Sequence, residues 1–285
     1  MTTLQERAFA KINLTLDILG RRADGFHDLE TVMQAVSLCD EVEVQVETGT
    51  EWSLTCETEG VPCDSRNLAW KAAELFQQES GRDLGGVSIR IVKRIPSQAG
   101  MGGGSADAAA VLRALNRWAG EPYSPMELAD LGAKIGSDVP FCVVGGTHMC
   151  KGRGERMRPL RAMPRCKIVV AKPDFGVSTP ALFRAIDDMD IPVHPDNAAM
   201  EQALEEGNLP KIGALLSNLF DIAVSREHPE MDHIRGILAS CGALGQQMTG
   251  SGSAFFGIMP DEASAERAAA LLREHYSCVF VCETV

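Results

Sequence analysis

The sequence P-S-Q-A-G-M-G-G-G-S-A-D, from Pro96 to Asp107, indicates the fold and the chemistry of this chain more directly than any other stretch. It places four glycines and two serines between an alternating apolar segment, residues 87–91, and a segment at 108–118 with the composition of a helix. Glycines let the backbone turn tightly and bring its N–H groups close to a ligand. A helix that begins at Ser105 would add free amides and a partial positive charge. The segment is therefore predicted to be a phosphate-binding loop.

A second interpretation of this loop stays open, in which it is a flexible connector and Ser105 only caps the following helix. Two familiar phosphate motifs do not fit. No Lys-Ser or Lys-Thr pair follows the glycines, which excludes the common P-loop. The dinucleotide fingerprint would place Ser105 where its last glycine belongs, and this strand–helix unit starts late in the chain.

Composition narrows the class of protein. With 285 residues, 45% hydrophobic and 23% charged, the chain has the composition of a soluble protein of one or two domains. No apolar run approaches the roughly 20 residues that span a bilayer, and we expect no export signal at the N-terminus. Nine cysteines without a C-x-x-C pair indicate reduced thiols and a cytoplasmic protein.

The charge balance bears on the partners. The chain has 27 basic and 39 acidic residues, a net charge of −12, which argues against nucleic-acid binding. We expect neither nucleic acid nor membrane as partner, and the sequence leaves the oligomeric state open. An acidic protein that binds phosphate must concentrate its positive charge locally, so individual lysines become informative.

The segment at residues 10–18 alternates strictly between apolar and polar residues, which predicts a strand with one buried face. Lys11 and Asn13 lie side by side on its other face. Further strands are expected at 29–36, 42–46, 87–95, 141–144, 166–171 and 278–282, with two more flanking the glycine-rich turn at 248–253. Helices are expected from the cap at Asp64 or Ser65 to Phe76, after the glycine loop, and at 125–135, 179–187, 197–206, 209–224, 229–240 and 263–275.

This order of elements predicts an α+β fold rather than regular βαβ alternation. The basic, irregular stretch at 151–165 suggests a boundary between a domain at 1–160 and a domain at 161–285.

The Lys/Asn strand face, the central glycine loop and the late G-S-G turn resemble, in that order, the GHMP kinases. Five motifs sharpen the resemblance toward the branch that phosphorylates a cytidine-diphospho-sugar alcohol in non-mevalonate isoprenoid synthesis. They are A-K-I-N-L (10–14), R-A-D-G-F-H (22–27), A-G-M-G-G-G-S (99–105), G-S-D-V-P-F (136–141) and T-G-S-G (249–252). The resemblance spans residues 8–257 and implies a two-domain GHMP-kinase-like fold, with an N-terminal ATP-binding domain and the active site in the cleft between the domains.

The resemblance also implies the cofactors ATP and Mg²⁺ and a set of site residues. In the implied reaction the γ-phosphoryl group of ATP moves to the 2-hydroxyl of the alcohol. Asp138 would be the general base for this step and Lys11 its partner. The ATP loop would comprise Pro96, Ser97, Gln98, Ala99, Gly100, Met101, Gly102, Gly103, Gly104, Ser105 and Ala106. The substrate would be held by Asn13, Phe26, His27, Thr179 and Phe183, with the two phenylalanines stacking the cytosine and His27 reading its edge. No residue is predicted as a direct metal ligand beyond a contact from Ser105 to phosphate or its Mg²⁺.

The chain departs from the family pattern at several positions. Ala106 stands where a second serine is common, so that position would offer only its backbone, and Phe26 stands where many members have tyrosine. Ser253 and Ala254 follow the late motif in place of Pro-Thr, and Asn218-Leu219-Phe220-Asp221 replaces an N-x-L-E segment.

Other interpretations of these residues and of the whole chain remain open. Asp138 could be a solvated helix terminus, Phe183 a core residue, His27 a turn residue, and Asn67 either an adenine contact or a helix cap. The chain as a whole could be another GHMP kinase acting on mevalonate, homoserine or a sugar. It could also be a catalytically silent nucleotide-binding relative or, least favoured, a dinucleotide-dependent oxidoreductase.

Overall fold

The computed structural model describes residues 2–47, 49, 51–189, 191 and 193–285, and these form two compact units. The first comprises the described residues within Met1–Ala10, Cys39–Ile95 and Gly102–Gly145. The second comprises those within Lys11–Leu38, Pro96–Met101 and Gly146–Val285. The predicted domain boundary near residue 160 stays a prediction. Both compact units contain residues that precede position 160, so they do not correspond to the two predicted domains.

The first unit contains strands that pair in the order β3-β4-β2-β1. They are β3 (Ser53–Cys56), β4 (Gly86–Val92), and the parts of β2 (His27–Glu47) and β1 (Thr2–Arg21) that fall in this unit. The β2–β4 pair is antiparallel, from Glu41 opposite Val92 to Glu47 opposite Gly86, whereas β3 and β4 run parallel. Alternate residues of these strands are buried, including Val42, Val44, Val46, Ile89 and Ile91, as expected for a sheet with one apolar face.

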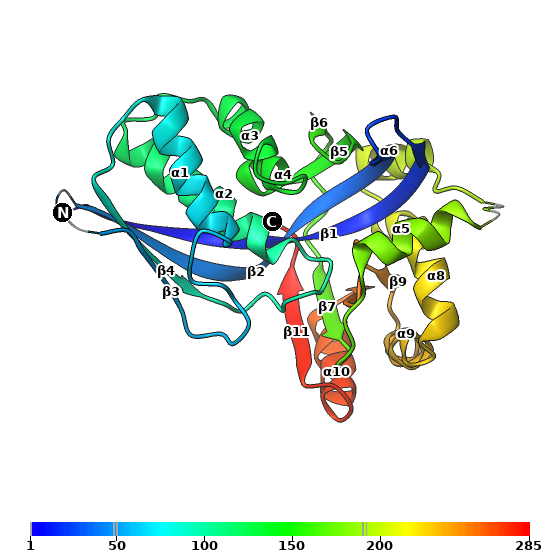
Figure 1. The fold of residues 1–285 in the computed structure, drawn as a ribbon. Helices are drawn as coiled ribbons and strands as arrows, with labels where there is room; N and C mark the ends of the chain where they lie inside the picture. The colour runs from blue at the N-terminus through cyan, green and yellow to red at the C-terminus, as the bar shows by residue number, and fades with distance from the viewer. Residues whose placement is uncertain (1, 48, 50, 190, 192) are drawn as a thin grey trace. The chain divides into compact units, whose positions relative to one another are not determined.

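The helices of this unit are α1 (Leu68–Ser80), α2 (Gly103–Trp118), α3 (Pro125–Ala133) and α4 (Val139–Val144). α1 packs along α2, and Figure 1 shows the two side by side. α3 begins at Pro125, as expected, and opens with a capping box in which Ser124 and Glu127 bond each other's backbone N–H. α1 is capped by Asn67 rather than by Asp64 or Ser65, and it runs past Phe76 to Ser80, where Gly81 in the left-handed conformation ends it.

The second unit contains a four-stranded antiparallel sheet in the order β11-β7-β10-β9. The strands are β7 (Lys167–Lys172), β9 (Gly245–Met248), β10 (Phe255–Met259) and β11 (Cys278–Glu283). In the same unit β2 pairs with β5 (Thr147–Gly152), which pairs with β6 (Arg156–Pro159). β1 pairs in parallel with the short β8 (Ser217–Asn218).

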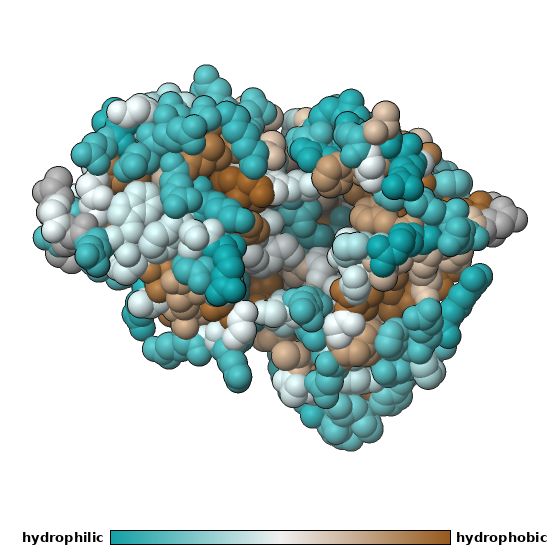
Figure 2. All heavy atoms as spheres, viewed as in Figure 1, coloured by the Kyte–Doolittle hydropathy of each residue, from teal (hydrophilic) through white to brown (hydrophobic). Residues whose placement is uncertain are grey.

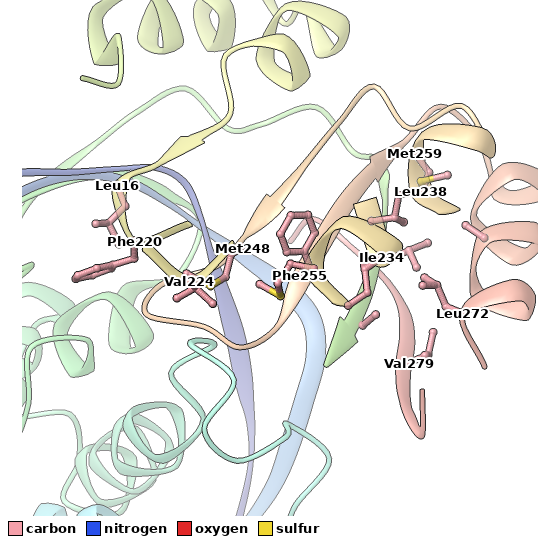
Figure 3. Packing of buried hydrophobic residues seen from close by; sticks show 14 of the residues in the cluster. Leu16, Phe220, Val224, Ile234, Leu238, Met248, Phe255, Met259, Leu272 and Val279 are labelled. Atoms are coloured by element: carbon pink, nitrogen blue, oxygen red, sulfur yellow. The ribbon is translucent and has the colours of Figure 1, made fainter. Parts of the chain in front are cut away.

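Six helices belong to this unit: α5 (Thr179–Asp187), α6 (Asn197–Glu206), α7 (Leu209–Ala214), α8 (Leu219–Glu227), α9 (Glu230–Ser240) and α10 (Glu262–Arg273). α8, α9 and α10 share a buried apolar cluster with the four-stranded sheet, in which Phe255, Met248, Leu238 and Leu272 pack together (Figure 3). The outer face of α10 is hydrophilic (Figure 2). Every helix in the described part of the chain is too short or too polar to cross a bilayer.

Several predicted elements need correction. Residues 141–144 form helix α4 rather than a strand, because a short apolar run fits a buried helix as well as a strand. The helix expected at 209–224 is two helices, α7 and α8, separated where Asn218 caps α8 by accepting from Phe220 N–H. The segments at 29–36 and 42–46 are one continuous strand, β2.

The strand at residues 10–18 is buried on both faces, which contradicts the prediction of a single buried face. Its polar side chains Lys11, Asn13, Thr15 and Asp17 are all less than 5% exposed. Alternation predicts which residues share a face, but it does not reveal that buried polar partners cover the second face.

Candidate active site

Two glycine-rich segments far apart in sequence meet within the second unit. The backbone N–H of Ser253 donates to the Gln98 carbonyl at 3.2 Å, and that of Ala254 donates to the Ala99 carbonyl at 3.3 Å. These bonds join the start of the glycine loop to the turn between β9 and β10. The late G-S-G sequence is thus a hairpin connection that also supports the loop.

Glycine is required at this junction by space as well as by conformation. Gly100 has φ +70°, and a Cβ there would overlap the Thr249 carbonyl and lie 2.9 Å from the Gly252 nitrogen. A Cβ on Gly250 would lie 2.6 Å from the Gly100 oxygen and 3.0 Å from the Lys11 Nζ. The backbones at Gly100 and Gly250 therefore lie so close together that neither position has room for a side chain. The Lys11 ammonium lies beside this junction.

Lys11 and Asn13 are fixed by a buried hydrogen-bond network. Lys11 Nζ donates to Asn13 Oδ1 at 2.7 Å, and its backbone N–H donates to the Met101 carbonyl at 3.0 Å. Asn13 Nδ2 donates to Thr31 Oγ1 at 2.8 Å, and its backbone N–H donates to Thr249 Oγ1 at 3.1 Å. The predicted pairing of Lys11 and Asn13 on one strand face is confirmed, and the backbone N–H groups of both residues bond to the two glycine segments.

The remaining part of the glycine loop belongs to the first unit and opens helix α2. The helix begins at Gly103, and its cap residue Gly102 has φ +71° and no side chain to cap it. Ser105 therefore lies inside the first turn and is not the N-cap. The first N–H groups of a helix have no acceptor within it, so this turn presents amides to a ligand.

Ala106 does not match its predicted role in the loop. Its backbone N–H already donates to the Gly102 carbonyl at 2.8 Å, and the residue is 1% exposed. Because the helix has already begun, this amide belongs to the helical ladder and is not offered to a phosphate.

Asp138 is the N-cap residue of α4 and is half-buried, and its side chain makes no capping hydrogen bond to that helix. A Cβ on Gly136, two residues earlier, would lie 4.0 Å from Ser105 Oγ. The segment that leads into Asp138 therefore packs beside the first turn of α2. The structure thus brings Ser105 and the Asp138 segment together within the first unit.

Among the predicted substrate residues, His27 lies differently from expectation. It is the first residue of β2 and is only 7% exposed, rather than part of an exposed loop. Its ring stacks on Phe183 with centroids 4.4 Å apart and planes 13° apart, and its Nε2 lies 2.7 Å from Asp187 Oδ1. Phe183 is half-buried against the apolar cluster and meets Phe220 edge-on, so it serves the core as well as the His27 stack.

Phe26, in contrast, is 53% exposed and stacks on neither of those rings. The Arg153 guanidinium lies 5.1 Å from its ring centroid, which is a cation–π arrangement. Nearby, Arg22 donates to Asp24, and this hydrogen bond lowers the pKa of the Asp24 carboxyl. Phe26 is therefore presented at a charged surface loop, apart from the His27–Phe183 stack.

Thr179 is the first residue of α5, and its Oγ1 lies 2.7 Å from Ser251 Oγ in the late glycine turn. Asn67 caps α1 through the N–H of Ala69, which confirms its helix-terminal role. Sequence reasoning missed Thr31, Thr249 and Asn218, whose side chains brace the Lys11–Asn13 pair and the late turn. Thr249 and Asn218 had a signal, because Thr249 begins the T-G-S-G motif and Asn218 begins the segment that replaces N-x-L-E; Thr31 had none.

A metal ion would depend on the nucleotide for most of its ligands. Among the residues that the structure describes, no group of three His, Cys, Asp or Glu side chains could hold an ion. The hydroxyl of Ser105 in the first turn of α2 fits a Mg²⁺ ion that is otherwise held by phosphate oxygens and water.

Comparisons with known proteins agree with this arrangement. Residues 67–146 match the model described as the GHMP kinases N terminal domain, and residues 200–278 match that of the GHMP kinases C terminal. The chain belongs to the GHMP kinases, and the prediction of a two-domain α+β fold of that family is confirmed.

Individual relatives are more specific. The chain is 42% identical to a protein of Caldicellulosiruptor saccharolyticus named 4-diphosphocytidyl-2-C-methyl-D-erythritol kinase, over 98% of this chain and 94% of the relative. It is also 42% identical to a protein of the same name from Pelotomaculum thermopropionicum, over 97% and 96% of the two chains.

Solved structures extend the comparison. A structure of 4-(cytidine 5'-diphospho)-2C-methyl-D-erythritol kinase superposes with a TM-score of 0.80 at 34% identity, covering 99% of both chains. Mevalonate kinase of L. major superposes with a TM-score of 0.79 at 18% identity, over 99% of this chain and 96% of that one, and this likeness shows the fold alone.

Proposed function

We propose that this chain transfers the γ-phosphoryl group of ATP to the 2-hydroxyl of 4-diphosphocytidyl-2-C-methyl-D-erythritol, a step of non-mevalonate isoprenoid synthesis. The observation that carries the proposal is the junction of the two glycine segments beside the Lys11 ammonium. The proposal is supported by two relatives that are 42% identical to this chain over nearly its whole length, both of which are named 4-diphosphocytidyl-2-C-methyl-D-erythritol kinase.

Phosphoryl transfer depends mainly on positioning and on neutralising phosphate charge. The glycine loop from Pro96 to Ser105 would hold the phosphates of ATP through the backbone N–H groups of the residues after Pro96, which has none, and Ser105 would contact phosphate or Mg²⁺. Bound Mg²⁺ would supply charge neutralisation on the phosphate oxygens. The net charge of −12 makes this local positive potential necessary.

Asp138 is assigned as the group that accepts the proton of the attacking hydroxyl, and Lys11 as the cation that balances charge on the reacting oxygens. The hydrogen bond from Lys11 Nζ to Asn13 Oδ1 restricts the ammonium to one direction. A fixed charge of this kind stabilises a transition state without reorganising during the reaction.

The cytidine part of the substrate needs flat surfaces and polar edges. Phe26, His27 and Phe183 are the aromatic groups proposed for it, with Asn13 and Thr179 as further polar contacts. The cation–π contact from Arg153 favours one orientation of the Phe26 ring, which lacks the tyrosine hydroxyl that many relatives have. Cysteines without disulfides are consistent with a cytoplasmic location.

The test is a coupled assay with purified protein, MgATP and the cytidine-diphospho alcohol, beside mevalonate, homoserine and galactose. We expect ADP release to depend on the cytidine substrate alone. Turnover of one of the other alcohols would identify a different kinase of the family. MgATP binding with no turnover of any acceptor would indicate a catalytically silent relative.

A further inference from the structure

A buried ion cluster lies against the glycine loop, within the first unit, and nothing in the proposed mechanism uses it. Lys93 Nζ donates to Asp40 Oδ2 at 2.5 Å and to Asp107 Oδ2 at 2.7 Å. The side chains of Lys93, Asp40 and Asp107 are 7%, 0% and 3% exposed. One ammonium thus joins two buried carboxylates.

The cluster connects the chain on both sides of the glycine loop. Lys93 lies just after β4, in the segment that enters the loop, and Asp107 lies in α2, the helix that leaves it. Asp40 completes the connection by accepting the backbone N–H groups of Arg94 at 2.5 Å and Ile95 at 2.8 Å. The residue before the loop's first proline is therefore held by a carboxylate of β2.

The ammonium also occupies the space beside the first residue of the helix. A Cβ on Gly103 would lie 3.2 Å from Lys93 Nζ and 3.1 Å from Ile95 Cγ2. The cluster is thus packed against the turn whose amides are expected to face phosphate. A displacement of Lys93 would be passed directly to the position of Gly103.

Stability alone does not account for this arrangement. Asp107 Oδ1 is buried and has no hydrogen-bond donor among the described residues, so the carboxylate carries an uncompensated desolvation cost. A buried ion pair is often no more stabilising than apolar side chains of similar volume. A role in fixing geometry explains why charged groups occupy the site.

From this geometry we infer that Lys93, Asp40 and Asp107 form a positioning clamp for the ATP loop. The clamp sets the distance between the segment that enters the loop and the helix that leaves it, and so fixes the amides that hold the nucleotide phosphates. None of the three side chains touches the reacting atoms. The inference rests on the proposed function in taking this loop to be the ATP site.

The clamp can be opened without leaving a lone buried charge. Asp107→Ala removes the tie to α2 but keeps the Lys93–Asp40 pair, so the variant is expected to fold. Asp107→Asn is the matched control, because its amide oxygen can still accept from Lys93 Nζ. Leu112→Ala, a fully buried position of α2, controls for loss of stability without loss of the clamp.

Titration calorimetry with MgATP provides a readout that needs no acceptor substrate. We expect Asp107→Ala to weaken MgATP binding about tenfold, and Asp107→Asn and Leu112→Ala to bind within about twofold of the parent chain. In the coupled assay, Asp107→Ala should raise the KM for ATP by a similar factor and leave the KM for the cytidine substrate unchanged.

The inference is overturned if Asp107→Ala binds MgATP like the parent chain, or if Leu112→Ala weakens binding equally. Should Asp107→Ala be insoluble, Asp107→Leu, which fills the same space, replaces it in the same titration. Failure of the proposed function looks different, because the parent chain would then bind MgATP without phosphorylating the cytidine substrate.

Discussion

Asp138 is the residue on which the proposed proton transfer depends. Asn at this position keeps the size of the side chain but cannot accept a proton. We expect Asp138→Asn to lower kcat by about two to four orders of magnitude and to leave both KM values within a few-fold. Steady-state kinetics with Asp130→Asn, an exposed position of α3, as control would check this. Turnover near that of the parent chain would restrict Asp138 to orienting the alcohol.

Asp107 should make the stability of the protein depend on pH. Burial, together with the neighbouring Asp40, raises the pKa of its carboxyl from 3.8 to about 7 against the opposing effect of the Lys93 charge. The folded state therefore binds the proton more tightly than the unfolded chain, so this contribution to stability is complete below about pH 4 and is lost as the pH rises to about 7.

The expected measurement is a difference between two proteins. From about pH 4 to 7, the free energy of unfolding of the parent chain should fall by about 1–4 kcal/mol relative to Asp107→Asn, which has no proton to lose. Urea unfolding at several pH values gives both quantities. A difference that stays constant across this range would show that Asp107 is ionised throughout.

At the residue scale, the sequence predicted which side chains lie together on one element better than it predicted how buried a side chain is or which distant residue it pairs with. The side chains of Lys11 and Asn13 were correctly placed on one strand face, because alternation fixes which residues share a face. The burial of His27 and its pairing with Asp187, 160 positions away, could not be predicted. Nothing local in the sequence encodes a partner brought in by a distant helix.

At the element scale, the junction of the two glycine segments is the feature most open to test. Gly100→Ala would force a Cβ into the Thr249 carbonyl, in addition to the strain of φ +70°. Gly146, in the same unit, has φ +69° and open space around it, so Gly146→Ala carries the conformational strain alone. We expect the control to cost about 1 kcal/mol of stability.

Gly100→Ala should cost more than its control by at least about 2 kcal/mol and should abolish turnover, since the overlap lies between two backbones. Chemical denaturation and the coupled assay measure the two effects. Equal losses in both variants would show that the close approach of these segments does not hold in solution.

The packing of α9 on β10 offers a second element-scale test. A Cβ on Gly257 would lie 3.0 Å from Leu238 Cδ2. Gly257→Ala should therefore cost about 1–3 kcal/mol in the parent chain and little or nothing when Leu238→Ala has emptied that space. A double-mutant cycle by denaturation gives the coupling energy, with exposed Leu271→Ala as the neutral control. Additive losses would contradict this packing.

Elements with chemical start signals were predicted better than those without. The capping box at Ser124 gave the start of α3, and alternating or helical periodicity gave α5, α9, α10 and β11 to within a few residues. The run at 141–144 was misassigned as a strand because its length and apolar character suit either element, and Pro140 before it fits a first helical turn.

At the scale of the whole molecule, the fold class followed from the order of elements and the five motifs, but the composition of the compact units did not. Both units take chain from residues 1–38 and from the glycine loop. Sequence reasoning divides a chain at irregular stretches, and it has no means of detecting strands such as β1 and β2 whose residues are shared between units.

Ligand binding should report on the whole fold, because a ligand that binds only the folded state stabilises it by mass action. MgATP at about one hundred times its Kd would add about 2.7 kcal/mol, and for a chain of this size that raises the apparent Tm by about 5 °C. The cytidine-diphospho alcohol should produce a shift of its own, and NADH should produce none, because no dinucleotide fingerprint opens α2. Thermal unfolding followed by tryptophan fluorescence measures all three. A shift with NADH and none with MgATP would reverse the choice between a kinase and a dinucleotide-dependent oxidoreductase.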